Sequence, residues 1–572
     1  MKKILQLLKK FRLAFIALAI VGYALVSYSF ADNYFEISKN LDIFSTMFRE
    51  LNIYYVDSIQ PGKLMKTGMD AMLASLDPYT DYIPESEIED YRFMTTGQYG
   101  GIGALIRQKG DYIYIAEPYE GYPAQKAGLM AGDKILEIDG VSVKGKNADE
   151  IGKFLKGQPN TSIKMLVERN GQNIEKTVQR EEIKISSVPY YGMVSKNTGY
   201  IRLTSFTENC ADSVQHALIT LKKNPDFKYL IFDLRGNPGG LLNEAVDMVN
   251  IFEPKGQLVV NTIGKMKEWD HGYKTLNPPT DLTTHIIVLV NGGSASAAEI
   301  TSGTIQDLDR GVIMGQRSFG KGLVQQTRPL SYNAELKLTV AKYYIPSGRC
   351  IQKLDYSHRT KSGTVEDVPD SLITAFRTKD GRIVYDGCGI DPDVKFKQEF
   401  ISNIELSLIN NSLIFDFATQ YRNTHPTIPP VANFTLTDKD FDNFLDFIKD
   451  KNYDYTTKSE EDLSKLKADT KKEKYFDGIA PEFTALENKI KHDKKADLEK
   501  NKTGIMELLE GEIVSRYYYQ EGRQADDLKW DPEIKDAVAL LNDSTRYDSI
   551  LTTIAKPIHP FHDQKVGLDT QK

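Results

Sequence analysis

The sequence predicts a multidomain α+β protein, and three observations support this fold class. The chain has 572 residues, which at roughly 150 residues per domain suggests about three or four domains. Hydrophobic residues make up 41% of it and charged residues 26%, an ordinary globular composition. Along the chain, helix-period apolar residues give way to short β runs, then to alternating strands and helices, then to a polar helical tail. A wholly disordered, collagen-like or multi-span membrane protein is therefore excluded.

The first segment, residues 1–31, is predicted to be an export signal or a membrane anchor. Lys2 and Lys3 follow the initial methionine, and further positive charges precede the uncharged apolar run 13–31. This run approaches the length of a bilayer span, yet it ends in small residues of the kind that a signal peptidase requires. We favour export and leave cleavage open. Residues from Asp32 onward would then lie in the periplasm or cell envelope, held at the inner membrane if the segment is retained.

A helical N-terminal region is predicted over residues 32–96. Apolar residues such as Leu41, Phe44 and Phe48 recur there at helical spacing, until a proline-containing turn at 76–81. Residues 97–182 are instead rich in short β runs that glycines punctuate. The clearest of these runs are 112–116, 134–138 and 162–169. This second region is therefore expected to be a compact β domain.

Residues 183–397 are predicted to form a sheet with helical crossovers. The apolar runs 229–234 and 286–291 read as buried strands, and each leads into a Gly-rich turn and then a helix. Residues 398–572 are polar and helical, with charge-dense stretches such as 458–474. Such stretches are usually solvated helix faces, so this last region is expected to be a helical C-terminal extension.

A candidate nucleophile, Ser296, lies where the second buried strand turns into a helix. A serine there is exposed at the carboxyl edge of the sheet, beside helix-start amides that favour developing negative charge. The first strand leads into the turn 235–241, whose glycine amides could bind an oxyanion. This turn is not a phosphate loop, because it has neither the Walker nor the dinucleotide pattern. Taken alone, each turn is most often a helix cap or a packing loop.

A nucleophilic serine needs a general base, for which histidine is the usual candidate. The eight histidines of the chain, however, show no recognisable partner motif. By contrast, Lys321 lies between two glycines in an apolar setting. Alone, Gly-Lys-Gly is most often an exposed hairpin tip. If Lys321 were buried beside Ser296, desolvation would lower its pKa from about 10.4 toward the range of a general base. Gln325 could then orient the lysine amine without adding charge.

Charge and cysteine content exclude several other classes. The formal net charge is −7, which gives no global footprint for nucleic acid, so no nucleic-acid partner is expected. The three cysteines fit neither a disulfide scaffold nor a zinc ribbon, although Cys350 and Cys388 could pair in an oxidising compartment. No clustered metal-ligand motif is present, so neither a metal nor another cofactor is expected.

Together, the motifs VNGGSASAAE, FGKGLVQ, DLRGNPGG and LDPYT resemble those of the carboxyl-terminal processing (tail-specific) serine peptidases. The resemblance covers roughly residues 35–395. It implies an α/β peptidase core in which Ser296 is the nucleophile, Lys321 is the base and Gln325 holds the lysine. It also implies an oxyanion hole formed by the amide of Ala297 together with that of Gly239 or Gly240.

The β domain, residues 97–182, resembles a PDZ domain of the peptidase type through QYGGIG, PAQKAGL and GDKILEIDG. Such a domain captures an extended chain end by strand addition. The implied partners are proteins or peptides with flexible apolar C-termini. The implied substrate-binding residues are Gly100, Gly101, Ile102, Gly103, Ala104 and Leu105. The helical extension would pack on the core, form oligomers or bind adaptor proteins.

The resulting prediction is a Ser/Lys endopeptidase that captures exported proteins by their C-terminal tails. Two alternatives remain. The first is a catalytically inactive PDZ scaffold of the cell envelope, which the intact set of Ser296, Lys321 and Gln325 disfavours. The second is a Ser-His-Asp hydrolase that keeps Ser296 and uses a histidine such as His271 or His285.

Overall fold

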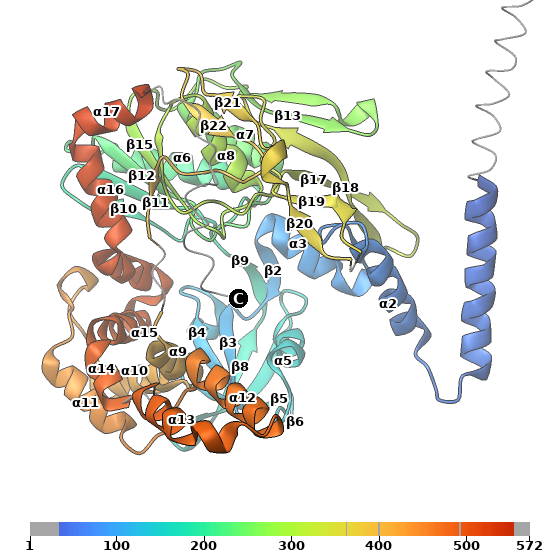
Figure 1. Cartoon of the computed structure of the whole chain (residues 1–572). Coiled ribbons are helices and arrows are strands. Elements are labelled where there is room, and N and C mark those ends of the chain that lie inside the picture. Colours follow the sequence, from blue (N-terminus) through green and yellow to red (C-terminus); the bar gives the residue numbers. More distant parts are fainter. Residues whose placement is uncertain (1–33, 362, 398–400, 491–493, 554–572) are drawn as a thin grey trace, which may run out of the picture. The chain divides into compact units, whose positions relative to one another are not determined.

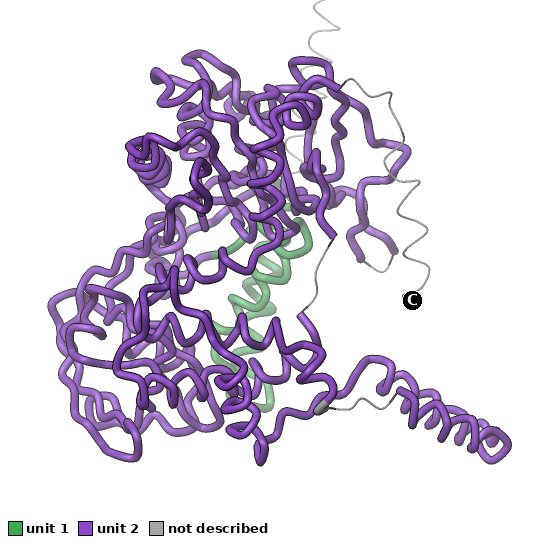
Figure 2. Tube along the Cα trace, turned by 90° about the vertical axis from the view of Figure 1, so that its left-hand side faces the viewer, with its two compact units in different colours: residues 1–82 green, residues 83–572 purple. Residues whose placement is uncertain are grey.

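The computed structural model (Figure 1) forms two compact units, residues 1–82 and 83–572, which Figure 2 shows in different colours. The residues that it describes are 34–361, 363–397, 401–490 and 494–553. The predicted export signal or membrane anchor, residues 1–31, lies outside these ranges. Within them, no helix combines the length and the apolar character needed to cross a membrane.

In its described residues, 34–82, the first unit is mainly helical, as the spacing of its apolar residues predicts. Residues 34–54 form a helix, and α2 (Pro61–Ala74) follows with a proline in its first turn. A turn then ends the helical region, because Asp77 Oδ1 accepts hydrogen bonds from Tyr79 N and Thr80 N, both at 2.8 Å. The short strand β1 (Asp81–Ile83) comes next in the chain.

An antiparallel sheet with strand order β3-β4-β5-β7-β8 forms the body of the small β domain. The predicted runs at 112–116, 134–138 and 162–169 correspond to β4, β5 and β7. The elements are α3 (Ile88–Thr96), β2 (Gln98–Gly101), β3 (Ala104–Lys109), β4 (Tyr112–Pro118), α4 (Pro123–Lys126), β5 (Lys134–Ile138), β6 (Val141–Ser142), α5 (Ala148–Leu155), β7 (Ser162–Arg169), β8 (Gln172–Gln179) and β9 (Glu181–Lys184). Alternate residues of these strands, together with α5, bury one apolar core.

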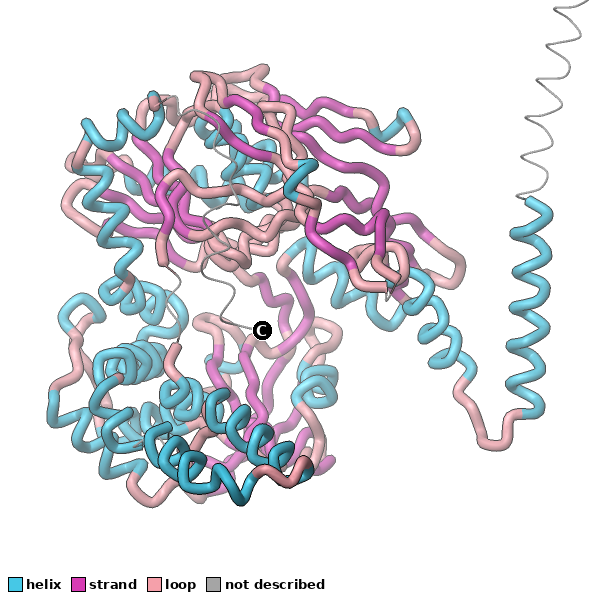
Figure 3. Tube along the Cα trace, viewed as in Figure 1, coloured by secondary structure: helices cyan, strands magenta, loops and turns pink. Residues whose placement is uncertain are grey.

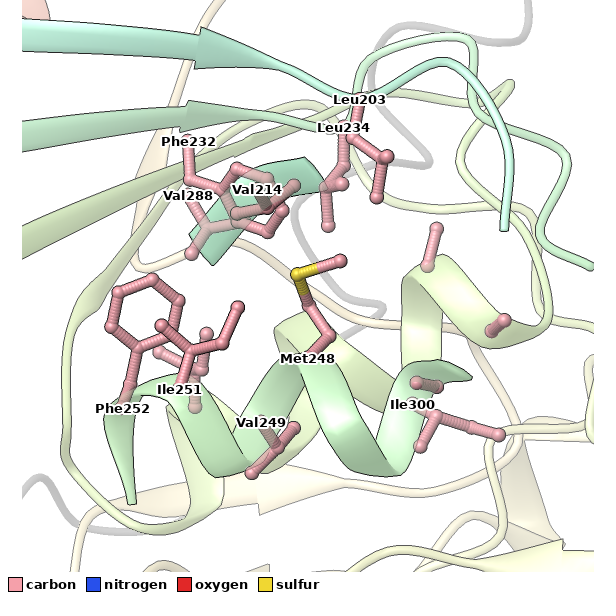
Figure 4. Close-up of a cluster of buried hydrophobic side chains, with 14 of the residues drawn as sticks. Leu203, Val214, Phe232, Leu234, Met248, Val249, Ile251, Phe252, Val288 and Ile300 are labelled. Carbon is pink, nitrogen blue, oxygen red and sulfur yellow. The ribbon is translucent and has the colours of Figure 1, made fainter. Parts of the chain in front are cut away.

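The next region contains a sheet with strand order β10-β11-β12-β15-β16-β23, parallel except for β10. Its strands and crossover helices are β10 (Tyr190–Met193), β11 (Thr198–Arg202), α6 (Cys210–Leu221), β12 (Tyr229–Asp233), α7 (Leu242–Phe252), β15 (His285–Val290), α8 (Ala297–Asp307), β16 (Val312–Gly315) and β23 (Val394–Lys395). Helices α6, α7 and α8 cover one face, where Phe232, Val288, Met248 and Ile300 meet (Figure 4). Helices on this face bury the apolar runs that predict β12 and β15.

A second, antiparallel sheet places β14, β13, β18 and β17 side by side. The remaining strands of this region are β13 (Leu258–Gly264), β14 (His271–Lys274), β17 (Leu323–Pro329), β18 (Glu335–Tyr344), β19 (Leu354–Arg359), β20 (Val365–Asp367), β21 (Ala375–Arg377) and β22 (Ile383–Tyr385). Cys350 and Cys388 are free, as is Cys210, so the two do not form the disulfide that their sequence allows.

The C-terminal extension is almost entirely helical in its described residues (Figure 3). Its helices are α9 (Asn403–Asn410), α10 (Leu413–Thr424), α11 (Asp438–Ile448), α12 (Lys458–Lys472), α13 (Phe476–Ile490), α14 (Lys494–Lys500), α15 (Lys502–Trp530), α16 (Pro532–Asn542) and α17 (Ser544–Thr552). Helix α16 packs against β12 and β15. Apolar residues of α16 and α17 form a second core with Ile231 and Leu289. Of the roles that the sequence suggests for the extension, packing on the core is therefore present.

The same extension also contacts the small β domain. Lys109 Nζ pairs with Asp416 at 2.6 Å, and Gln125 Nε2 donates to the Tyr519 hydroxyl at 2.8 Å. Tyr519 interrupts α15, with φ +51° and ψ −154°. The extension thus touches both the β domain and the parallel sheet.

Candidate active site

Ser296 lies in a strained turn between β15 and α8. It is the N-cap of α8 and has φ +55° and ψ −115°, a conformation that a non-glycine residue adopts only when its surroundings impose it. The neighbouring Ser294 fixes the turn, because its hydroxyl donates to Leu234 O at 2.8 Å and accepts from Asn291 N at 2.9 Å. The turn after β12 and the turn after β15 are therefore joined directly.

The turn formed by Gly239 and Gly240, here called the GG turn, lies against Ser296. A Cβ added to Gly239 would lie 2.8 Å from both Ser296 Cβ and Ala297 N. Gly239 has φ +93°, which glycine adopts without strain. The turns are also linked by a hydrogen bond from Ala295 N to Asn237 O at 2.9 Å. The predicted nucleophile and the predicted oxyanion-binding groups are thus close together.

The sequence does not decide whether Gly239 or Gly240 supplies an amide to the oxyanion hole, but the hydrogen bonds of the two glycines differ. Gly239 N donates to Asn237 Oδ1 at 2.8 Å. Within the described residues, the amides of Gly240 and Ala297 have no hydrogen-bond acceptor, and Gly240 is exposed. The geometry therefore favours Gly240 and Ala297 as the donors available to an oxyanion.

The Lys321 loop is packed rather than being an exposed hairpin tip. Gly320 and Gly322 are buried, and Lys321 is partly buried between them. Gly322 N donates to Gln352 Oε1 at 2.8 Å, and Lys353 N donates to Gly320 O at 2.9 Å. A lysine held in this way has little freedom of its main chain, as a base with a fixed position requires.

Glu299 connects the serine turn to the lysine loop. Its Oε2 accepts hydrogen bonds from Ser296 N and from Lys321 N, both at 2.9 Å. Its Oε1 accepts from Gly320 N at 2.7 Å and from the Ser318 hydroxyl. The side chain is fully buried. One carboxylate therefore fixes residues 296 and 321 relative to each other.

The hydroxyl of Tyr343, on β18, makes a second connection between the two segments. It donates to Lys321 O at 2.6 Å and lies 3.3 Å from Ser296 O. The sequence analysis missed both Glu299 and Tyr343. Glu299 stands in the motif that carries Ser296 and could have been found from it, whereas Tyr343 is one aromatic residue of a strand and carries no such signal.

Gln325 lies on β17, directly opposite Thr339 of β18. Its Nε2 donates to Thr339 Oγ1 at 3.1 Å. This bond orients the side-chain amide. Its Oε1 is then the atom that could accept a hydrogen bond from a lysine amine. The contact with Thr339 thus fixes the side chain of Gln325. That Gln325 holds Lys321 stays a prediction.

The ionisation of Glu299 depends on its burial. Burial raises the pKa of Glu299 from 4.5 to about 7, although its hydrogen bonds from Ser318, Lys321, Gly320 and Ser296 lower it in part. The four hydrogen bonds favour the ionised carboxylate, whereas desolvation favours the neutral acid. The two effects oppose each other at this position.

The two histidines considered as alternative bases lie in other settings. His285 begins β15, whereas Ser296 follows the opposite end of that strand. The ring of His285 is stacked between those of Tyr229 and Tyr547, with centroids 5.9 and 4.8 Å away. His271 is exposed on β14. Five residues of strand separate His285 from the carboxyl edge, which is about 17 Å.

The predicted peptide-binding segment links β2 to β3, and β3 is an edge strand of its sheet. Ile102 and Gly103 form the loop between them, and their amides have no hydrogen-bond acceptor among the described residues. Ile102 is buried in the domain core, and Leu105 is 44% exposed. An edge strand that follows a loop with available amides can accept an added strand and its carboxylate.

Side chains that could hold a metal ion are not clustered in the described residues: no group of three or more His, Cys, Asp or Glu is suitably arranged there.

Three known families match successive parts of the chain. A PDZ domain matches residues 114–169, Peptidase family S41 matches residues 197–359, and "Probable PDZ-protease, C-terminal helical domain" matches residues 404–541. The matches follow the order of the β domain, the parallel sheet with its Ser296 turn, and the helical extension.

Curated relatives agree with these families. A carboxy-terminal-processing protease of Bartonella bacilliformis is 37% identical over 319 residues, 55% of this chain and 73% of that protein. A protein of Staphylococcus aureus named "Probable CtpA-like serine protease" is 31% identical over 409 residues, 70% of this chain and 80% of that protein. Among solved structures, the photosystem II D1 C-terminal processing protease is 25% identical, with 62% and 87% of the two chains covered and a TM-score of 0.33.

These features define a multidomain serine peptidase with a PDZ domain, a mixed α/β core and a C-terminal helical domain. The chain belongs to peptidase family S41, the carboxy-terminal-processing proteases.

Proposed function

We propose that this peptidase is an endopeptidase with a Ser296–Lys321 dyad, which binds exported proteins by their C-terminal tails and cleaves them. The observation that carries the proposal is the carboxylate of Glu299. This carboxylate accepts hydrogen bonds from both Ser296 N and Lys321 N. It therefore holds the serine turn and the lysine loop together at the carboxyl edge of the parallel sheet, where the GG turn also lies. No histidine is needed to assemble this site.

The proposed chemistry uses the lysine as both base and acid. Neutral Lys321 Nζ takes the proton of Ser296 Oγ as this oxygen attacks the peptide carbonyl carbon. The amides of Ala297 and Gly240 stabilise the oxyanion. When the C–N bond breaks, the lysine gives its proton to the leaving amine. Water, deprotonated by Lys321, then hydrolyses the ester, and Ser296 regains its proton.

The dyad predicts that cleavage of an unfolded test protein with an apolar C-terminus is lost in both Ser296→Ala and Lys321→Ala. Removal of a nucleophile or its base typically lowers kcat by on the order of 10⁴-fold or more. The measurement is kcat/KM for each variant beside the wild type, with the folded state checked by circular dichroism.

His271→Ala and His285→Ala are the controls for this experiment. Both are expected to retain cleavage. Inactivity of a histidine variant, with Lys321→Ala still active, would overturn the lysine assignment and support a Ser-His hydrolase. If the wild type binds tail peptides but neither cleaves protein nor reacts with a fluorophosphonate, the inactive scaffold is the better description.

The PDZ domain is the proposed site of tail recognition. The amides of Ile102 and Gly103 would receive the terminal carboxylate, while the tail adds as a strand beside β3. Leu105 offers an exposed apolar side chain at the start of that strand. The same segment is therefore suited to flexible tails with apolar ends.

Amidation of the substrate's terminal carboxylate should raise KM by about 10-fold or more and leave kcat nearly unchanged. A hydrogen bond to a charged group contributes about 1.5–3 kcal/mol, which corresponds to roughly 10- to 100-fold in affinity. Steady-state cleavage of two substrates that differ only in this group tests the prediction. Equal KM values would show that the terminal carboxylate is not recognised.

The periplasm or cell envelope is the proposed location. Its support is the lysine-led apolar segment 1–31 of the sequence. An exported enzyme of this class would meet its substrates outside the cytoplasm, and retention of the apolar segment would keep it at the inner membrane.

A further inference from the structure

Arg235 is held by carboxylates of two different domains. It stands in the loop that follows β12 and leads into the GG turn. Asp233, at the end of β12, accepts from its Nε at 3.0 Å and from its Nη2 at 2.6 Å. Asp531 contacts Nη2 at 2.7 Å, and Glu533 contacts Nη1 at 2.8 Å. Asp531 and Glu533 belong to the C-terminal extension, about 300 residues further along the chain.

These groups are largely removed from water. The Arg235 side chain is 15% exposed, those of Asp531 and Glu533 are each 19% exposed, and Asp233 is fully buried. Burial alone would raise the pKa of Asp233, but the charge and hydrogen bonds of Arg235 more than offset this, so the pKa is lowered. Such desolvated, charge-assisted contacts fix geometry far more firmly than a surface ion pair does.

Arg235 is connected to the nucleophile through two residues of main chain and one hydrogen bond. Two residues beyond it, Asn237 accepts from Ala295 N at 2.9 Å, next to Ser296. The Asn237 side chain accepts from Gly239 N at 2.8 Å. A shift of Arg235 would therefore move the GG turn relative to the serine.

The two carboxylates have a rigid support of their own. Asp531 is the N-cap of α16 and accepts from Glu533 N at 2.8 Å and Ile534 N at 3.2 Å. Helix α16 buries Ile534 and Leu540 in the core that it shares with the parallel sheet. The acidic pair is thus fixed to the same sheet that carries the active site.

We propose that Asp531 and Glu533 are positioning residues of the catalytic centre: they hold Arg235 and, through it, set the GG turn opposite Ser296. This inference rests on the proposed function, since it assigns oxyanion stabilisation to that turn. The C-terminal extension then forms part of the active enzyme, because it supplies contacts without which the oxyanion-binding amides are misplaced.

The double variant Asp531→Asn/Glu533→Gln tests the proposal. Asparagine keeps the cap of α16 while the charge is removed. We expect kcat to fall by about 10- to 100-fold, with KM within about 2-fold of the wild type. Affinity for a peptide boronic acid, which forms a tetrahedral adduct on the serine, should fall by the same factor. Because partial unfolding would also lower the apparent kcat at an unchanged KM, kcat is expressed per folded enzyme, with the folded fraction measured by circular dichroism.

Tyr547→Phe is the matched control. The Tyr547 hydroxyl donates to Ile286 O at 2.9 Å and accepts from Ile286 N at 3.1 Å. It therefore anchors the same extension to the same sheet, at the end away from the GG turn. This variant should keep its kcat and its boronate affinity. In an Arg235→Gln background, the double substitution should cause no further loss, since both carboxylates act through Arg235.

Three results would overturn the proposal: an unchanged kcat in the double variant, an equal fall in Tyr547→Phe, or a full additional loss in the Arg235→Gln background. Failure of the proposed dyad has a different signature. It would appear as undiminished cleavage by Lys321→Ala, while the boronate comparison would still report the positioning of the GG turn.

Discussion

Replacing Gly239 by alanine is expected to abolish peptidase activity, with a fall in kcat on the order of 10³-fold or more. The added Cβ would lie 2.6 Å from Ala295 O and 2.8 Å from both Ala297 N and Ser296 Cβ. These atoms are main chain or the first atom of the nucleophile's side chain, so none can move without moving the site. The φ of +93° adds backbone strain. The oxyanion donors and the serine would separate.

Gly236→Ala is the matched control for this prediction. Gly236 lies in the same loop and also has positive φ, +70°, but a Cβ there would meet nothing within 4 Å. It should lose about 1 kcal/mol of stability through backbone strain and keep most of its activity. Kinetics and urea unfolding of both variants separate the steric effect from the conformational one. An active Gly239→Ala enzyme would show that the two turns are not held as closely as described.

The sequence predicts the parts of this fold whose signals are local. Buried strands such as β12 and β15 are continuous apolar runs between glycines, so their positions follow from pattern alone. The turn that carries Ser296 is predictable for the same reason, because a strand, small residues and a helix adjoin in the sequence. Even the partial burial of Lys321 could be suspected, since it stands between glycines in an apolar stretch.

Other features depend on contacts between distant residues and have no local signal. The carboxylates on Arg235 come from an extension whose sequence is otherwise typical of solvated helices. Tyr343 joins Ser296 to Lys321 only because β18 lies beside both segments. The choice between Gly239 and Gly240 depends on where the Asn237 side chain points. Chain topology brings these groups together, and a single sequence does not reveal it.

Glu299→Gln is expected to lower kcat on the order of 10²- to 10³-fold in a chain that still folds. Glutamine has the same shape, and its oxygen can keep the contacts of one carboxylate oxygen. Its NH₂ group would then face Ser296 N and Lys321 N, which are themselves donors. The link between the two amides would be lost, and the Tyr343 hydroxyl would remain as a weaker connection between the two segments.

Glu244→Gln controls for the loss of a buried carboxylate. Glu244 is also buried, and it accepts from two main-chain amides, Asn209 N at 2.8 Å and Ala211 N at 3.1 Å. Glu244→Gln should lose about 1–3 kcal/mol of stability, as is also expected of Glu299→Gln. Its kcat should be unchanged. An equal kcat in Glu299→Gln and the wild type would mean that Glu299 serves folding alone.

The pH dependence of stability supplies an independent test of the buried Glu299. Its folded pKa of about 7 lies above its ordinary value of 4.5, so between these pH values the unfolded chain releases a proton that the folded chain keeps. The stabilisation is complete below pH 4.5 and is lost as pH rises to about 7, about 3 kcal/mol in all. Glutamine does not titrate. The stability of the wild type relative to Glu299→Gln should therefore be greater at about pH 5 than at about pH 8 in urea unfolding, and a difference that grows with pH would contradict this assignment.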